Sequence, residues 1–136
     1  MSDRGEIENV LNRYSIAYDD NDMAEMADTF TDDAVLTMRI ADGDLIGPFE
    51  GKEAIMKLMV DSLASQTDQR RHVTTNLAVR REDGRSAAVS SYLTLISVEN
   101  GAARVLSTAR YDDELRREDD GAWRFTKRHI QLDLPY

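Results

Sequence analysis

Histidines are the side chains best suited to proton transfer near neutral pH, and this chain has two of them, His72 and His129. His72 begins a segment with period-two alternation, in which it shares one face with Thr74 and Asn76. This position suits a catalytic base, and it equally suits a half-exposed histidine at the edge of a sheet. His129 shares its predicted face with Trp123, which favours a packed or interface histidine over a base.

Carboxylates gather at Asp19, Asp20 and Asp22, directly after an apolar stripe that includes Tyr14 and Tyr18. Acidic residues between helices are usually solvated caps. Asp19, however, follows Tyr18 and is expected at the edge of the core, where a carboxylate needs a partner. The sequence leaves both interpretations open.

Metal and nucleotide chemistry fit the sequence less well. The two histidines are not spaced as metal ligands, and the acidic residues lie on a bend that faces several directions, so we predict no metal site. Cysteine is absent, which excludes disulfides and cysteine nucleophiles. Gly43, Gly47 and Gly51 lack the lysine and hydroxyl residue of a phosphate-binding loop. We therefore expect chemistry without a cofactor.

The composition is typical of one globular domain covering residues 1–136, with 41% hydrophobic and 32% charged residues. The net charge of −9 disfavours binding to nucleic acids and anionic membranes, and the basic run 70–72 is too short to reverse it. The sequence has no basic-then-apolar leader and no apolar run of membrane-spanning length. We therefore expect a cytoplasmic protein.

The first half of the chain has helical periodicity. From Arg4 onward, apolar residues recur at three- and four-residue spacing. Asp22 is placed to cap a second, short helix, and Gly51 precedes a third. We expect helices over residues 4–18, 23–30 and 51–65, a strand over 34–40, and an irregular connection over 41–50.

The second half of the chain has the period of strands. After His72 the apolar period changes from 3.6 to 2, and three turn signals at 83–84, 100–101 and 120–121 divide the remainder. Consecutive strands joined by tight turns are antiparallel, and the preceding helices must cover the concave face of the resulting sheet. We expect an α+β fold with strands over 72–81, 86–98, 102–117 and 122–134.

Five segments, in this order and spacing, resemble the SnoaL-like members of the nuclear transport factor 2-like superfamily over nearly the whole chain. They are YSIAYDDNDM at 14–23, TFTDDAV at 29–35, GKEAI at 51–55, RHVTTN at 71–76 and GAWRF at 121–125. The resemblance implies a cone-shaped barrel, in which a strongly curved, mostly antiparallel sheet is covered by three N-terminal helices and encloses an apolar pocket. The superfamily contains enzymes and non-catalytic subunits, so the fold alone does not choose a function.

The resemblance also implies a catalytic site. Tyr18 and Asp19 are similar to a Tyr-Asp pair in dehydratase members, and His72 is similar to the histidine that dehydratase and dehydrochlorinase members carry at the start of a strand. Asp19 would then orient His72 as a general base, and Tyr18 would act as electrophile or acid. The chain lacks the second histidine of those dehydratases, and Tyr92 is the candidate donor in its place.

Arg128 is similar to an arginine on the last strand of dehydrochlorinase-like members, where it holds an anionic leaving group. Strand alternation places Arg128 opposite Trp123 unless a bulge intervenes, and favours a solvated Arg128 paired with Asp112 or Glu114. The remaining candidates for substrate binding are residues of the predicted apolar faces, Tyr14, Met38, Phe49, Met59 and Leu63.

Together these features predict a cofactor-free lyase of the dehydratase type, with Asp19, His72 and Tyr18 acting on a small hydrophobic cyclic or aromatic substrate. The alternative is a non-catalytic module for ligand binding or oligomer assembly, and a polyketide cyclase or an isomerase is a further alternative. We expect a homodimer or a higher homo-oligomer, formed through the exposed face of the sheet.

Overall fold

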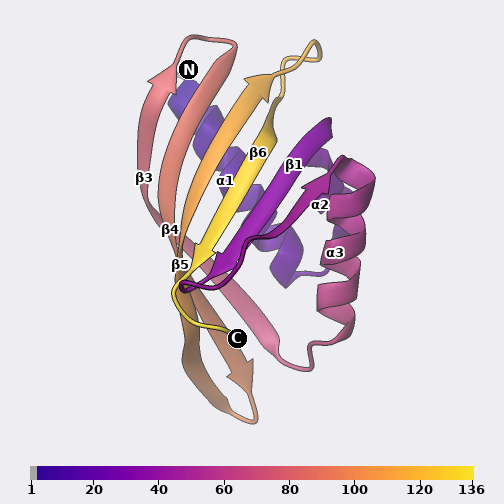
Figure 1. The fold of residues 1–136 in the computed structure, drawn as a ribbon, viewed down its shortest axis with the longest axis vertical. Coiled ribbons are helices and arrows are strands. Elements are labelled where there is room, and N and C mark those ends of the chain that lie inside the picture. The colour runs from indigo at the N-terminus through magenta and orange to yellow at the C-terminus, as the bar shows by residue number, and fades with distance from the viewer. Residues whose placement is uncertain (1–2) are drawn as a thin grey trace.

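The computed structural model describes residues 3–136, which form helices and strands in the order shown in Figure 1. Within this part of the chain, no helix has the length and hydrophobicity needed to cross a membrane. The elements are α1 (Asp3–Asp19), α2 (Met23–Asp28), β1 (Phe30–Ile40), β2 (Ile46–Glu50), α3 (Lys52–Ala64), β3 (Gln69–Glu82), β4 (Ser86–Glu99), β5 (Ala102–Arg117) and β6 (Trp123–Leu132).

The strands form one curved, unclosed sheet in the order β2-β1-β6-β5-β4-β3. β1 and β6 are parallel, and all the other neighbours are antiparallel. β3 to β6 follow one another through tight turns, which join antiparallel strands. α1 lies across the sheet and α3 lies beside β1 and β2 (Figure 1). The predicted α+β class and the antiparallel arrangement of the last four strands are confirmed.

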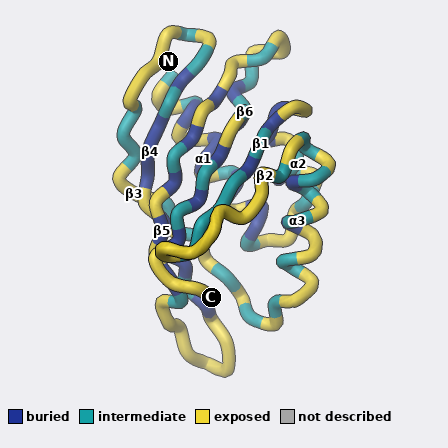
Figure 2. The backbone as a smooth tube through the Cα atoms, in the orientation of Figure 1, coloured by how far each residue is buried: buried dark blue, intermediate teal, exposed yellow. Residues whose placement is uncertain are grey.

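The core lies between α1 and the inner face of the sheet. Alternate residues of β4 and β5 are buried, whereas the loops at the ends of the sheet are exposed (Figure 2). From α1, the residues at three- and four-residue spacing point toward the sheet, as predicted. Those that pack in the core are Ile7, Val10, Leu11, Tyr14 and Tyr18.

Two predicted boundaries were wrong. Phe30 begins β1 rather than ending the second helix, because the Thr29 hydroxyl donates to the Met26 carbonyl at the end of α2 and the Phe30 ring packs on Phe125. The predicted irregular connection over 41–50 contains an edge strand, β2. Pro48 is tolerated there because an edge strand leaves one side of its backbone unpaired.

A bulge in β3 changes which residues face the core. Asn76 has a left-handed backbone with φ 58°, and the pairing with β4 shifts between Thr75 and Ala78. As a result, Leu77 packs against the core on the same side as His72, and Asn76 is exposed. The prediction that Asn76 and His72 share a face was therefore wrong.

A second irregularity lies where β6 pairs with β5. Their register shifts between Glu114 and Leu115. Trp123, Phe125 and Arg128 are consequently all buried, although strict alternation would put Arg128 on the opposite face. The expectation of a solvated Arg128 was wrong for this reason.

Candidate functional site

Asp19 and His72 form a buried hydrogen-bonded pair. His72 Nδ1 lies 2.6 Å from Asp19 Oδ1, and the His72 backbone N–H donates to Asp19 Oδ2 at 2.9 Å. Their side chains are only 8% and 7% exposed. Two contacts to one carboxylate fix both the position and the ring orientation of His72. Asp19 contacts Nδ1, so Nε2 is the ring nitrogen that is not bonded to this carboxylate.

Local sequence explains how Asp19 reaches His72. Asp19 is the last residue of α1, and the chain turns at once through Asn21, whose φ is 55°. Asp22 then caps α2 by accepting from the Glu25 N–H. The Gln69 side chain donates to the Asp19 carbonyl at 2.9 Å, which joins the end of α1 to the start of β3.

Tyr18 packs against the same histidine. Its ring lies 4.4 Å from the His72 ring, and its hydroxyl accepts from Gln66 Nε2 at 2.6 Å. Burial raises the pKa of the Tyr18 hydroxyl, which therefore stays protonated. The structure thus brings Tyr18, Asp19 and His72 together.

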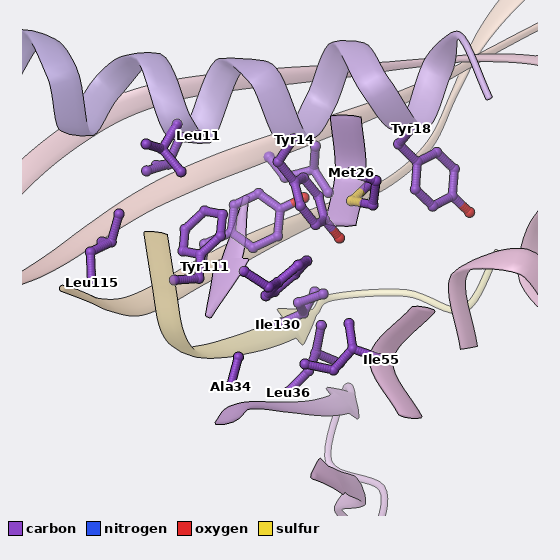
Figure 3. Close-up of a cluster of buried hydrophobic side chains, with 14 of the residues drawn as sticks. Leu11, Tyr14, Tyr18, Met26, Ala34, Leu36, Ile55, Tyr111, Leu115 and Ile130 are labelled. Carbon is purple, nitrogen blue, oxygen red and sulfur yellow. The ribbon is translucent and has the colours of Figure 1, made fainter. Parts of the chain in front are cut away.

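A chamber lies beside the pair, lined by His72, Ser62, four tyrosines and aliphatic or methionine side chains. The free space in the chamber is about 30 Å³, which is enough for one or two water molecules. The side chains that line it fill the rest. In Figure 3, Tyr14 and Tyr18 project from one side of α1, with Tyr111 and Ile130 on the sheet side. Tyr14 and Tyr111 are fully buried, and this burial raises the pKa of both hydroxyls.

Some of the other predicted substrate-binding residues line the chamber, and the others lie outside it. Tyr14, Met38 and Met59 line the chamber. Phe49 packs against the edge of the core, and Leu63 borders a separate polar pocket on the other side of Tyr18. Tyr92 is 53% exposed and borders a groove on the outer face of the sheet with Thr75, because its position in β4 alternates with the buried residues.

Arg128 is fully buried in the core and does not line the chamber. Its Nε lies 3.0 Å from Asp113 Oδ1, without the angles of a hydrogen bond. Its guanidinium carbon lies 3.5 Å from the centre of the Tyr111 ring, 4.2 Å from that of Tyr14 and 4.5 Å from that of Phe125. Aromatic faces attract a cation, and these three replace part of the water that the guanidinium loses.

Asp113 is the unusual partner in this pair. Burial raises its pKa to about 7, although the neighbouring Arg128 acts in the opposite direction. Neither Asp113 nor Tyr111 was among the site residues predicted from the sequence. Period-two alternation contains the signal, because it puts them on the same face of the 102–117 segment as Leu115, and a charged residue on an apolar face is unusual.

The second histidine lies apart from the chamber. His129 Nδ1 is 2.7 Å from the Thr37 hydroxyl, and the ring borders an outer groove with Asp112 and Lys127. Within residues 3–136, no group of three or more His, Asp or Glu side chains is arranged to hold a metal ion.

The model of the SnoaL-like domain family matches residues 1–129. The chain belongs to this family. None of the curated protein sequences compared with it matches.

Solved structures with the same fold include other proteins of about this size. A protein from Catenulispora acidiphila, solved in complex with S-DNPA, is 26% identical, with a TM-score of 0.80 over 95% of this chain and 92% of its own. A Nostoc punctiforme protein of unknown function with a cystatin-like fold is 24% identical, with a TM-score of 0.82 over 98% and 94%. ActVI-ORFA from Streptomyces coelicolor is 22% identical, with a TM-score of 0.80 over 97% and 98%. Since SnoaL-like folds host many functions, the fold alone does not identify the chemistry of this chain.

Proposed function

We propose that this SnoaL-like protein is a cofactor-free lyase that removes a proton from carbon, with His72 as the base and Asp19 as its partner. The observation that carries the proposal is the 2.6 Å contact between the two buried side chains beside an apolar chamber. A histidine held by a carboxylate is the usual arrangement of a general base, because the carboxylate stabilises the imidazolium that forms.

The reaction follows from the ring orientation. Asp19 accepts a hydrogen bond from Nδ1–H, so Nε2 carries the lone pair that takes a proton from the carbon next to a carbonyl. The electron pair of the broken C–H bond forms an enolate and then a C=C bond as the carbon–oxygen bond to a β-hydroxyl breaks. The proton on Nε2 leaves with the hydroxyl as water, so the base is restored.

The lining supports a small hydrophobic cyclic or aromatic substrate. Leu93, Leu95, Ile130 and Leu132 offer no charge to a ligand. A six-membered ring needs more than the present 30 Å³, so binding requires the flexible side chains Met38 and Met59 or the exposed Tyr136 to move.

Deuterium exchange tests the base directly. The protein is incubated in D₂O with 2-tetralone and 2-indanone, and loss of the α-proton signals is followed by NMR. We expect catalysed exchange that falls at least about 100-fold in His72→Ala, which is the usual contribution of a general base. Cyclic β-hydroxyketones are tested in parallel for formation of the conjugated enone.

His129→Ala is the matched control, because it removes the other histidine from the opposite side of the sheet. It should exchange like the wild type. Equal exchange by folded His72→Ala and the wild type contradicts the proposal.

A non-catalytic ligand-binding module is the second candidate. The S-DNPA complex of the Catenulispora acidiphila protein favours it. It predicts that the same ketones raise the melting temperature without exchange or elimination.

A further inference from the structure

Arg128 is the least expected side chain in the core. It is 0% exposed, and none of its three guanidinium nitrogens has a hydrogen-bond partner among residues 3–136. Burying a guanidinium is costly even beside a counterion, here Asp113 Oδ1 at 3.0 Å from Nε, and a methionine of similar length would fill the space without that cost. Packing alone therefore does not account for a guanidinium at this position.

Its neighbours indicate what the charge acts on. The guanidinium carbon is 3.5 Å from the centre of the Tyr111 ring, which is the closest of its three aromatic contacts. Tyr111 in turn lines the chamber that also contains His72. The cation is thus separated from the chamber by a phenol ring rather than exposed to it.

A cation on the face of a phenol withdraws electron density from the ring and makes the O–H a stronger hydrogen-bond donor. Burial keeps the Tyr111 hydroxyl protonated, and the Arg128 charge opposes this effect only in part. A protonated, polarised phenol donates a hydrogen bond to an oxygen that becomes negative.

The hydroxyl of Tyr18 is less suited to that role. Gln66 Nε2 donates to the Tyr18 oxygen at 2.6 Å, which fixes that oxygen beside a residue that borders the polar pocket and does not line the chamber. Tyr14 lines the chamber too, but its ring centre is farther from the cation, at 4.2 Å.

We infer that Tyr111 is a catalytic residue that donates a hydrogen bond to the substrate carbonyl oxygen, and that Arg128 is a positioning residue that strengthens this bond through the Tyr111 ring. The inference rests on the proposed function, because it concerns the enolate that forms when His72 removes a proton. The negative charge of that enolate lies on the oxygen that Tyr111 holds.

The first experiment is Tyr111→Phe, which removes only the hydroxyl. We expect deuterium exchange of 2-tetralone to fall about 100-fold, as when one donor to a developing oxyanion is removed, with little change in the melting temperature. Tyr14→Phe is the matched control in the same chamber, and its exchange of 2-tetralone should fall much less. Exchange by Tyr111→Phe within twofold of the wild type, or a larger loss in Tyr14→Phe, overturns the role of Tyr111.

The second experiment isolates Arg128. Arg128→Met is combined with Asp113→Asn, so that no unpaired carboxylate is buried, and Tyr111→Phe is measured in that background. If Arg128 acts through the hydroxyl, Tyr111→Phe costs less than about 10-fold there. A cost equal to that in the wild type overturns the role of Arg128, because a purely structural arginine would not change it.

A third variant tests the role of Arg128 if the combined variant does not fold. Asp113→Asn alone keeps the cation and removes the carboxylate that neutralises it, so exchange should be maintained or rise. A fall of more than tenfold in the folded variant overturns the proposal. His72→Ala distinguishes failure of the proposed function from failure of this inference. If His72→Ala catalyses exchange like the wild type, the proposed function fails. If His72→Ala loses exchange and Tyr111→Phe keeps full activity, only this inference is rejected.

Discussion

The carboxylate of Asp19 makes two contacts to one residue, the ring and the backbone N–H of His72. A carboxylate that is almost fully buried loses most of its hydration, and two donors return part of it. The same contacts orient the imidazole. At this scale, stability and chemistry depend on the same hydrogen bonds.

Asp19→Asn tests this pair without changing its shape. An amide is uncharged and cannot stabilise the imidazolium as a carboxylate does. It also has one acceptor oxygen, whereas Asp19 contacts His72 Nδ1 with one oxygen and the His72 backbone N–H with the other. We expect ketone exchange to fall about 100-fold or more. The measurement is α-proton exchange by NMR, beside a melting curve that reports folding.

Ser15→Ala is the control for Asp19→Asn. Ser15 also joins α1 to β3, through a 3.0 Å contact to the Thr74 hydroxyl, but it does not touch the histidine. Its exchange rate should stay close to that of the wild type. Similar losses in both variants would mean that the contact between α1 and β3, rather than the carboxylate, controls the rate.

At the scale of elements, the bulge of β3 determines which of its residues enter the core. It depends on Asn76, a residue type that adopts a left-handed backbone more readily than most. Leu77 packs inward only because the bulge shifts the alternation.

Asn76→Val should therefore lower the free energy of unfolding by about 1–2 kcal/mol, because a β-branched residue is strained at positive φ. Asn76→Gly should be nearly neutral, since glycine adopts this conformation freely. Urea unfolding measures both. An equal loss in the two variants would reject backbone strain as the cause.

Tyr136 is a chamber residue that lies beyond the last strand. Its ring is half exposed and lies against Arg70, 5.2 Å from the guanidinium carbon. The preceding Leu134 is tied to Ser107 by hydrogen bonds of 2.7 and 3.2 Å.

Tyr136→Ala should enlarge the chamber and increase exchange of 2-tetralone several-fold, with a stability change within about 0.5 kcal/mol, as for other exposed positions. Leu134→Ala is the control, because Leu134 is 59% exposed and does not line the chamber. If both variants exchange at the wild-type rate, Tyr136 does not limit entry.

For the whole molecule, the buried Asp113 links stability to pH. Its pKa is about 7 in the folded protein, against about 4 for an ordinary aspartate. Between these values the folded state binds a proton that the unfolded chain has released. The contribution of Asp113 to the free energy of unfolding is therefore present below about pH 4 and is lost as the pH rises through 7.

Asp113→Asn removes this titration. Between pH 4 and 7.5, the free energy of unfolding of the wild type should fall relative to that of the variant, as measured by urea unfolding at each pH. The comparison is between the two proteins because carboxylates such as Asp28, whose pKa the Arg13 side chain lowers, act in the opposite direction. Parallel pH profiles would contradict the assignment.

The α+β class, the helical face of α1 and the antiparallel strands could be predicted from the amino-acid sequence. These depend on local periodicity and turn residues, which act within a few positions of the chain. The sequence also selected Asp19 and His72 as a candidate pair by residue type and by resemblance.

Which of the candidate residues meet depends on long-range packing. Asp19 and His72 are 53 positions apart in the chain, and packing of α1 on β3 brings them together. The inward orientation of Arg128 depends on a register shift between β5 and β6. Arg128 lies in the core for this reason, since one residue of slippage in a strand moves a side chain to the other face. Tyr92 is exposed because regular alternation in β4 places it on the outer face. Local patterns therefore predict the elements, whereas long-range packing determines the chemistry that they bring together.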